Sequence, residues 1–383
     1  MKTTNLLLVT LFIFLGASCA TNNRRDDEIH LVHWNIKELD NTKLSKKNDQ
    51  LTSVKNILEK LDFDAISVNE IQYDLPNGKN LEKLLGQLKE DTSEFAFSFT
   101  QANTGNKAKK VNGKYSKDRK NADQVNYGLF PGQYSTGFAS KHPIKEEIIV
   151  KDLQWKEFNP AADFSKFRDG AGKKLPKEME LFDKSFTHLV VEVADQDVHI
   201  ILLHTVPSYH FGNRQTPNYE RNRDQLRFLE WYVTGATNFN VKLPKKYAHL
   251  KPIHKEDRVI IMGDFNTSIY MNNPGSVVLR RLFNHLNPWL KNPGPTNERQ
   301  TFAANRNPLT LDYIAYRGLK LIDSGIYNPE TLVNKGNVFC TPPSQLPKYM
   351  IKGLDKRVSC IDDDAIELKK ASDHFPIWAT FRL

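Results

Sequence analysis

Short hydrophobic segments that end in carboxylate, amide or imidazole side chains constrain this chain more than any other feature. The clearest is residues 260–266, Ile-Ile-Met-Gly-Asp-Phe-Asn, where the apolar run predicts a buried strand and Gly263 lets the chain turn. Asp264 and Asn266 lie two positions apart on an extended segment, so their side chains face the same way. The pattern predicts a sheet whose strand ends carry chemistry.

The same pattern recurs along the chain. The polar residues at the other strand ends are Asn35, Glu70, His204, Asp312, Asp373 and His374. Asp312 stands inside an apolar stretch, and a buried carboxylate is costly without a partner, so we expect it to have one, such as a histidine. Each residue taken singly also has a structural interpretation. Asp264 and Asp373 could cap turns or helices, and His204 could be a hydrogen-bonded core histidine.

Predicted strands and helices interleave without strict alternation. Apolar residues at helical spacing predict a helix over residues 49–61. Further helices are expected near residues 81–88, 220–233 and 275–286. Strand patterns occupy residues 29–36, 64–68, 95–100, 134–140, 186–193, 198–204, 258–262, 311–316 and 377–383. This arrangement favours a layered α/β fold with mixed sheets over a purely parallel, doubly wound sheet.

Three stretches lie outside these elements. Residues 101–125 are rich in lysine and asparagine, residues 151–185 are polar with few periodic apolar positions, and residues 325–369 hold the last two cysteines. We expect all three to be long surface loops, which in compact enzymes tend to be functional or mobile. No internal repeat or linker rich in Pro, Gly or Ser interrupts the chain. Residues 29–383 are therefore expected to form one domain.

The N-terminus has the parts of a secretory signal peptide over residues 1–18: a positive start, an apolar run from Leu6 to Leu15, and small residues before Cys19. The run is too short to span a bilayer as a mature helix, which needs about 20 residues. Small residues directly before Cys19 resemble the lipobox of bacterial lipoproteins. We expect an extracytoplasmic protein, lipid-anchored to a bacterial membrane through Cys19 or simply secreted, with residues 19–28 as a polar tether.

Export would also place the remaining cysteines in a compartment where they can form a disulfide. Cys340 and Cys360 are the only two left, and an oxidising compartment permits a disulfide between them. No Cys-x-x-Cys or Cys/His spacing supports a zinc finger. The formal net charge of +9 suits anionic partners such as phosphorylated molecules, nucleic acid or lipid headgroups, without choosing among them.

Seven short motifs follow one another along the chain. They are Trp-Asn-Ile at 34–36, Asn-Glu-Ile-Gln at 69–72, Ser-Lys-His-Pro-Ile at 140–144, His-Thr at 204–205, Gly-Asp-Phe-Asn at 263–266, Leu-Asp-Tyr-Ile at 311–314 and Ser-Asp-His-Phe-Pro-Ile at 372–377. In this order they resemble the deoxyribonuclease I-like endonuclease/exonuclease/phosphatase superfamily, as in a secreted bacterial member. The resemblance covers about residues 29–383 and implies a four-layer sandwich of two mixed β-sheets flanked by helices.

The resemblance also implies a metal side of the site. Asn35 and Glu70 would sit at the metal, Glu70 as the principal ligand, with Asp373 in support. Hard oxygen ligands of this kind suit Mg²⁺, and Mn²⁺ or Ca²⁺ would also be compatible.

The other residues would act on water and phosphate. Asp264 and Asn266 would orient the nucleophilic water and the phosphoryl oxygens, and His204 would donate to a phosphate oxygen. Asp312 would orient His374, which acts as general base or stabilises charge in the transition state. Whether Asp264 or His374 removes the proton is left open by the sequence.

Two further segments resemble the superfamily with departures. Residues 132–144 match a Gly-Gln-Tyr-Gly pattern in which Ser135 replaces the expected glycine, and Tyr134 is a candidate phosphate contact or a packing residue. Residues 221–228 match an Arg-Asn-x-x-Glu pattern with glutamine in place of the carboxylate. Arg221 and Arg223 could hold substrate or could form a solvated helix start.

Together these features predict a divalent-metal-dependent phosphoesterase that hydrolyses phosphate esters by in-line attack of an activated water. Its substrate would be a phosphorylated small molecule. The main alternative is a secreted or surface-anchored nuclease, and the less favoured ones are a sphingomyelinase-like enzyme and a non-catalytic binding protein. Apart from the N-terminal anchor we expect no membrane contact, and we expect a monomer.

Overall fold

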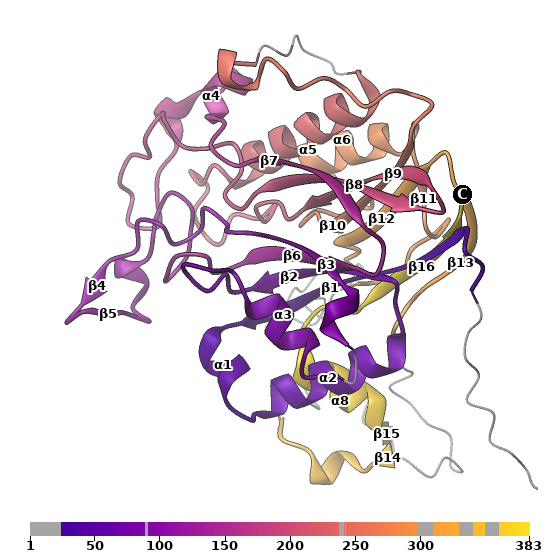
Figure 1. Cartoon of the computed structure of the whole chain (residues 1–383). Helices are drawn as coiled ribbons and strands as arrows, with labels where there is room; N and C mark the ends of the chain where they lie inside the picture. Colours follow the sequence, from indigo (N-terminus) through magenta and orange to yellow (C-terminus); the bar gives the residue numbers. More distant parts are fainter. Residues whose placement is uncertain are drawn as a thin grey trace, which may run out of the picture.

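Two six-stranded sheets pack face to face, with helices on both outer surfaces, in the computed structural model of the chain (Figure 1). The structure describes residues 24–88, 91–236, 241, 243–296, 309–328, 340–348 and 360–383. This arrangement confirms the expected four-layer sandwich.

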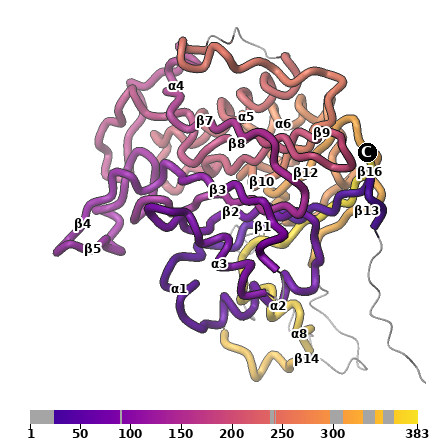
Figure 2. The backbone as a smooth tube through the Cα atoms, in the orientation of Figure 1, coloured from indigo at the N-terminus to yellow at the C-terminus, as the bar shows by residue number. Residues whose placement is uncertain are grey.

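The first sheet has the order β13 (Lys320–Ile326), β16 (Ile377–Arg382), β1 (Glu28–Leu39), β2 (Ala65–Ile71), β6 (Ser135–Ser140) and β3 (Ala96–Thr100). β1 and β2 run parallel, and the other neighbours are antiparallel. Figure 2 shows that β1 and β16, from opposite ends of the chain, lie side by side. The sheet is therefore mixed, as expected.

The second sheet has the order β11 (Asn287–Pro288), β12 (Asp312–Arg317), β10 (Arg258–Asp264), β9 (Gln196–Leu203), β8 (Phe186–Val193) and β7 (Ile144–Val150). Only β9 and β10 run parallel in this sheet. The predicted strand over 198–204 corresponds to β9, and the one over 258–262 to β10, which continues as far as Asp264.

Helices cover the outside of each sheet. Those beside the first sheet are α1 (Asn41–Ser45), α2 (Asp49–Leu61), α3 (Asn80–Leu85) and α8 (Asp363–Ala371), and those beside the second are α5 (Asn218–Thr234) and α6 (Pro274–Leu282). α2 has the bounds predicted from its apolar spacing. Its N-terminus is capped by Asn48, whose side chain accepts a hydrogen bond from the Leu51 amide. Leu51, Val54 and Leu58 turn inward and fix the helix to the sheet.

Smaller elements complete the chain. They are α4 (Trp155–Phe158), β4 (Lys110–Val111), β5 (Lys114–Tyr115), β14 (Cys340–Thr341), β15 (Ile361–Asp362) and the 3₁₀ turns η1 (Thr92–Glu94), η2 (Arg119–Asn121), η3 (Phe164–Lys166), η4 (Lys245–Tyr247) and η6 (Pro343–Gln345). The basic stretch 101–125 reaches the surface as expected, because its β4–β5 hairpin is exposed and projects from the body (Figure 1).

The prediction that residues 151–185 form a surface loop is wrong. Trp155 and Phe158 are fully buried and join the main core between the second sheet and α5. Trp155 stacks on Phe167 with ring centroids 5.3 Å apart, and Phe158 packs against Phe228. Trp155 and Phe158 share the helix α4, but it is only four residues long, so too few positions exist for a search of the sequence to detect its period. The segment has little regular secondary structure, and its aromatic side chains form part of the main hydrophobic core.

The expected surface loop over residues 325–369 is wrong in part, because residues 363–369 belong to helix α8, which continues to Ala371. Ile366 and Leu368 are buried, and α8 packs beside α2. The acidic first turn of α8 and the lysines in its last turn match the helix dipole.

The first described residues and the C-terminus meet where β1 begins and its neighbour β16 ends. Arg382 forms an ion pair with Glu28 at 2.6 Å, and the Leu383 amide donates to the Asp27 carbonyl. Arg24 pairs with Asp62 and Asp64, so residues 24–28 contact the domain. The predicted signal peptide, residues 1–18, and Cys19 lie outside the described residues.

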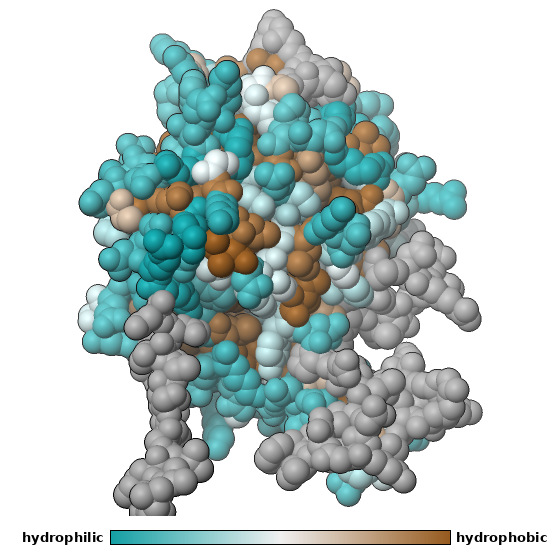
Figure 3. Space-filling model, turned by 90° about the vertical axis from the view of Figure 1, so that its right-hand side faces the viewer, coloured by the Kyte–Doolittle hydropathy of each residue, from teal (hydrophilic) through white to brown (hydrophobic). Residues whose placement is uncertain are grey.

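Figure 3 looks onto the side of the molecule that bears the C-terminus. There, hydrophobic residues form separate patches among hydrophilic ones (Figure 3). Among the described residues, no helix combines the length and the apolar character needed to cross a bilayer.

Candidate active site

The candidate residues meet because of strand direction. β1 and β2 run parallel, as do β9 and β10, whereas β16 and β12 run antiparallel to β1 and β10. The carboxyl ends of four strands therefore lie beside the amino ends of β12 and β16. In register, Asp264 is opposite Asp312, and His33 is opposite Ile377. Side chains from both sheets converge at this end of the sandwich.

Asn35 joins carboxylates from the two sheets. Its Nδ2 donates to Glu70 Oε1 on β2 and to Asp264 Oδ2 on β10, both over 3.1 Å. The Asp264 amide in turn donates to Asn69 Oδ1 over 3.1 Å. Asn35 and Asp264 are at most 1% exposed, so the linkage is removed from solvent.

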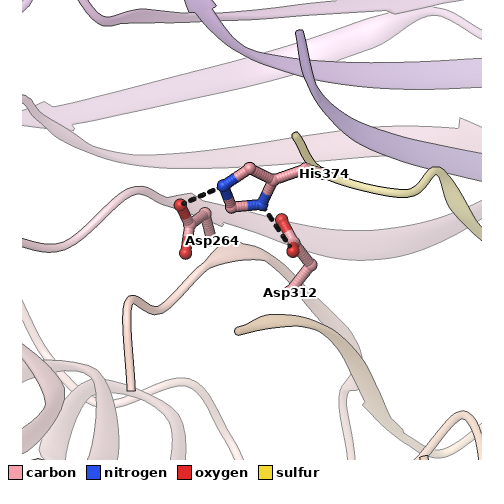
Figure 4. A group of neighbouring side chains, drawn as sticks. All are labelled: Asp264, Asp312 and His374. Carbon is pink, nitrogen blue, oxygen red and sulfur yellow. Dashed lines mark hydrogen bonds and ion pairs between the residues drawn. The ribbon is translucent and has the colours of Figure 1, made fainter. Parts of the chain in front are cut away.

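His374 lies between two carboxylates (Figure 4). Its Nδ1 donates to Asp312 Oδ2 over 2.8 Å, and its Nε2 is 3.8 Å from Asp264 Oδ2. The expected histidine partner of Asp312 is confirmed. His33 is a second one, with Nε2 3.5 Å from Asp312 Oδ1.

These neighbours separate the pKa values of the group. Burial alone would lower the pKa of His374, but Asp312 and Asp264 raise it to about 10. Burial would raise the pKa of Asp312, and the adjacent His374 holds it down at about 2. His374 is therefore an imidazolium, oriented by an ionised Asp312 at neutral pH.

The two remaining carboxylates titrate near neutrality. Burial raises the pKa of Asp264 to about 6, against the charge of His374. Burial likewise raises the pKa of Glu70 to about 7, and Asp373 and Glu38 push it in the same direction. A carboxyl with a pKa in this range can hold or release a proton at neutral pH.

Backbone geometry places these groups. Gly263 on β10 approaches β9 so closely that a Cβ atom there would lie 1.7 Å from the Leu203 carbonyl oxygen. Asn266 has a φ of 48° and Glu70 a φ of 65°, conformations that ordinary residues rarely adopt. Asn266 Nδ2 donates to Asp264 Oδ2 and to the Thr205 carbonyl, each over 3.1 Å. Asp264 and Asn266 are thus held side by side, but, contrary to the expectation from the sequence, the segment is not extended throughout, because β10 ends at Asp264 and Asn266 is left-handed.

The site has two cation-binding possibilities among the described residues. Asp264, Asp312 and His374 offer ligand atoms that all lie within 4.8 Å of one another. However, both His374 nitrogens face carboxylates and the ring is protonated, so this group is better described as an ion-paired triad with one hydrogen bond, between His374 and Asp312. Glu70 has the opposite character: it is a carboxylate whose charge is opposed by burial and by neighbouring carboxylates. A divalent cation with oxygen ligands would relieve that repulsion, so Glu70, Asn35 and Asp373 fit such an ion.

Asp373, Tyr134 and His204 lie around this cluster. Asp373 Oδ2 is 3.9 Å from Lys37 Nζ. Tyr134 donates its hydroxyl to Glu38 Oε1 over 2.7 Å, and the Glu38 amide donates to Glu70 Oε2 over 3.2 Å. Tyr134 therefore borders the Glu70 side, where a phosphate contact stays a prediction.

His204 Nε2 lies 3.6 Å from Asp264 Oδ2. Burial lowers the pKa of His204, and the nearby Lys184 and His374 add to this effect. His204 is therefore neutral and can donate one hydrogen bond without carrying charge.

Sequence reasoning missed Lys184. Its ammonium group is buried, donates to Asp183 Oδ2 over 2.7 Å and to the Thr205 carbonyl over 3.2 Å, and lies near enough to His204 to affect its pKa. It stands in the polar stretch 151–185, just before β8, where no motif singles it out. Its place at the start of a strand of the second sheet is the only signal that could have identified it.

The structure argues against substrate binding by Arg221 and Arg223. Arg221 is 2% exposed, and its guanidinium donates to the carbonyls of Leu181, Val125 and Glu180 and to the Asn126 side chain. Arg223 pairs with Asp224 at 2.8 Å. Neither is the solvated helix start that was the other interpretation. Arg221 joins two loops, around residues 125–126 and 180–181, to α5 in the interior.

The cysteines are only partly described. Cys360 is disulfide-bonded, and the antiparallel pair β14–β15 sets Cys340 opposite Asp362, two residues from Cys360. The side chain of Cys340 lies outside the described part, so its bond to Cys360 stays a prediction.

Comparison with known proteins gives structural neighbours only. No family model matches the sequence, and no curated protein matches it significantly. The solved structure of an endonuclease/exonuclease/phosphatase from Beutenbergia cavernae DSM 12333 is similar, with 13% identity, a TM-score of 0.50, and coverage of 93% of this chain and 72% of that one. One from Bacteroides vulgatus has 11% identity, a TM-score of 0.47, and coverage of 93% and 99%. The human Nocturnin catalytic domain with bound sulfate has 13% identity, a TM-score of 0.45, and coverage of 93% and 94%.

Proposed function

Because the chain has the fold of the endonuclease/exonuclease/phosphatase proteins, we propose that it is a divalent-metal-dependent phosphoesterase acting outside the cytoplasm. It hydrolyses phosphate esters by in-line attack of an activated water. One observation carries the proposal: the Asn35 amide joins the half-buried Glu70 and the buried Asp264 in a set that also holds the Asp312–His374 pair. This set supplies a cation site, a carboxyl that titrates near neutrality and a fixed positive charge.

On the metal side, Glu70, Asn35 and Asp373 would hold Mg²⁺, or Mn²⁺ in its place. A bound cation of this kind polarises a phosphoryl group and neutralises its charge. Glu70 is the principal ligand because its carboxylate combines burial with a neighbouring acidic group, and both raise its pKa. The amide of Asn35 fixes the orientation of that carboxylate.

On the water side, Asp264 accepts the proton of the attacking water, because its pKa of about 6 leaves it ionised but basic at neutral pH. Asn266 holds the Asp264 carboxylate beside the phosphoryl group, and the neutral His204 donates to a phosphoryl oxygen. His374 is already protonated, so it stabilises negative charge that develops in the transition state. The structure thus favours Asp264 over His374 as the base.

Export is the second part of the proposal and depends on residues 1–19. A cell expressing the full chain should place it outside the cytoplasm, and Cys19 should incorporate labelled palmitate. Loss of the label in Cys19→Ala with export retained would support the anchor, whereas an unlabelled wild-type chain would leave simple secretion.

The central experiment is a hydrolysis panel on purified residues 20–383 with Mg²⁺, Mn²⁺ or Ca²⁺. Its substrates are bis-p-nitrophenyl phosphate and p-nitrophenyl phosphate. We expect metal-dependent release of nitrophenol that EDTA abolishes and that Asp264→Asn reduces by roughly 10³-fold or more. Asp195→Asn, on the exposed β8–β9 turn, is the matched control and should retain activity. No hydrolysis with any metal and any ester would refute the proposal.

Metal binding has a readout that does not depend on turnover. Titration of Mn²⁺ followed by electron paramagnetic resonance should give one tight site in the wild type. Glu70→Gln should weaken it by about tenfold or more, since the amide removes the ligand charge. Equal affinity in Glu70→Gln would remove Glu70 from the metal site.

A further inference from the structure

The loop that follows β9 carries two exposed aromatic residues next to the site. Tyr209 is 58% exposed and Phe211 is 61% exposed. Their rings meet edge to face, with centroids 5.0 Å apart and planes at 87°. The loop begins directly after His204 and Thr205, so the pair lies a few residues from a site histidine. Large apolar side chains at this exposure indicate a surface that binds something.

The loop is tied to the site at its start. The Ser208 amide donates to the Asn266 carbonyl over 3.0 Å, and the Val206 amide donates to Gln225 Oε1 on α5 over 2.8 Å. The residue that precedes Tyr209 is therefore hydrogen-bonded to one of the residues proposed to orient the phosphoryl group.

The loop is also braced at its far end. Asn213 Nδ2 donates to the carbonyls of Arg168 and Asp169, and the Arg168 amide donates to the Gln215 carbonyl. The Tyr209 carbonyl accepts a hydrogen bond from Asn218 Nδ2 over 3.2 Å. Since both ends are held, the exposure of the two rings reflects a fixed presentation. A pre-positioned platform loses less entropy when a ligand binds.

A second observation points to a ligand at the same place. Ser208 is only 4% exposed, yet its hydroxyl has no hydrogen-bond partner among the described residues. A buried hydroxyl of this kind is costly unless something binds it. Ser208 directly precedes Tyr209 in the chain, and its amide is bonded to the Asn266 carbonyl.

We infer that Tyr209 and Phe211 form a stacking platform for the nucleobase of a nucleotide phosphoester, with its phosphate beside Asn266 and its sugar near the Ser208 hydroxyl. This inference rests on the proposed function. A nucleotide joins an aromatic base to a phosphate through a polar sugar, which matches the order of groups on the loop. Exposed aromatic side chains bind bases by stacking without requiring a particular base sequence. The overall basic charge suits the anionic substrate.

A lipid surface fits the loop less well. The residues beside the pair are polar, namely His210, Asn213, Arg214 and Gln215. An element that inserts into a membrane presents a broad apolar face. Two rings interrupted by polar residues provide too little apolar area for that role.

The test compares two diesters with the same leaving group, thymidine 5′-(p-nitrophenyl phosphate) and methyl p-nitrophenyl phosphate. We expect the wild type to prefer the thymidine ester in kcat/KM by about tenfold or more, mainly through KM. The double variant Tyr209→Ala/Phe211→Ala should bring that ratio close to one. Tyr209→Phe/Phe211→Tyr should restore it, because two aromatic rings remain. Tyr115→Ala, an exposed aromatic residue on the separate β4–β5 hairpin, should keep the wild-type ratio.

The outcomes separate the two proposals. Hydrolysis of both esters by the wild type without preference would overturn the platform and leave the phosphoesterase intact. Failure to hydrolyse either ester while p-nitrophenyl phosphate is cleaved would also overturn the platform, whereas failure on these esters and on the whole panel above would refute the proposed function itself. An equal loss on both esters in the alanine variant would show that the loop only supports the fold, and so would overturn the inference. Binding of the wild type to phosphatidylcholine vesicles, lost in the alanine variant without a change in ester preference, would assign the pair to a lipid surface instead.

Discussion

His374 and His188 are both at most 4% exposed, yet their pKa values move in opposite directions. His374 lies between Asp312 and Asp264, and its pKa rises to about 10. His188 on β8 is buried beside another imidazole: its Nε2 is 2.9 Å from His199 Nδ1, and its Nδ1 is 3.0 Å from the Tyr232 hydroxyl. Burial and His199 lower its pKa to about 4. The partner of a buried histidine, more than the burial itself, decides whether it carries charge.

The largest expected effect separates the two histidines by function. His374→Ala should reduce kcat by roughly 10³-fold or more, because it removes a fixed positive charge from the transition state. His188→Ala should retain activity and lose stability, since it deletes a buried ring that packs against Tyr232. Assays of kcat and thermal melts on both variants check this. A catalytically intact His374→Ala enzyme would contradict the proposed role of the imidazolium.

The next effect tests how Asp312 maintains the charge on His374. Asp312→Asn keeps the shape and removes the anion that raises the pKa of His374, so that pKa should fall towards its ordinary value. We expect kcat to drop by roughly 10²- to 10⁴-fold, by analogy with other carboxylate–histidine pairs. Because the active form is the protonated ring, the alkaline limb of the pH–kcat profile should move to lower pH. An unshifted limb would show that Asp312 does not hold this proton.

The sequence predicted best those features that depend on residues close to one another in the chain. The bounds of α2 follow from apolar spacing and the Asn48 cap, both within the helix itself. A partner for Asp312 was predictable from the cost of a buried charge. Its identity came from a residue 62 positions away, which only the chain order of motifs suggested.

The failures have a common physical cause, which is that long-range contacts override local appearance. Arg221 looks like the start of a solvated helix, yet backbone carbonyls from distant loops surround it. Trp155 and Phe158 lie three residues apart on α4, a helix of four residues that is too short to give a recognisable period, so their burial is not apparent until the sheet they cover is known. Lys184 was missed for the same reason, because its partner Thr205 lies 21 positions further along the chain.

A smaller effect concerns acid stability at His188. Its folded pKa of about 4 lies below the ordinary value of 6.5, so the unfolded chain binds the proton more readily between these values. Stability from this group is complete above pH 6.5 and declines as the pH falls towards 4. The group should account for about 2 kcal/mol of the free energy of unfolding lost between pH 7 and pH 5. Urea unfolding of His188→Gln should show a smaller decline over this range, and an identical decline would show that His188 is already charged when folded.

The smallest effect concerns the arginines of α5. Arg223 is 2.8 Å from Asp224, whose carboxylate also accepts hydrogen bonds from the Trp155 indole and the Asn159 amide over 2.7 Å each. Arg223→Ala should leave kcat/KM within about threefold of wild type, because the partly exposed pair contributes little beyond local packing. Steady-state assays with bis-p-nitrophenyl phosphate measure this. A rise in KM of about tenfold or more with kcat retained would show that Arg223 binds substrate. The substrate would then contact α5 at Arg223, despite the ion pair between Arg223 and Asp224.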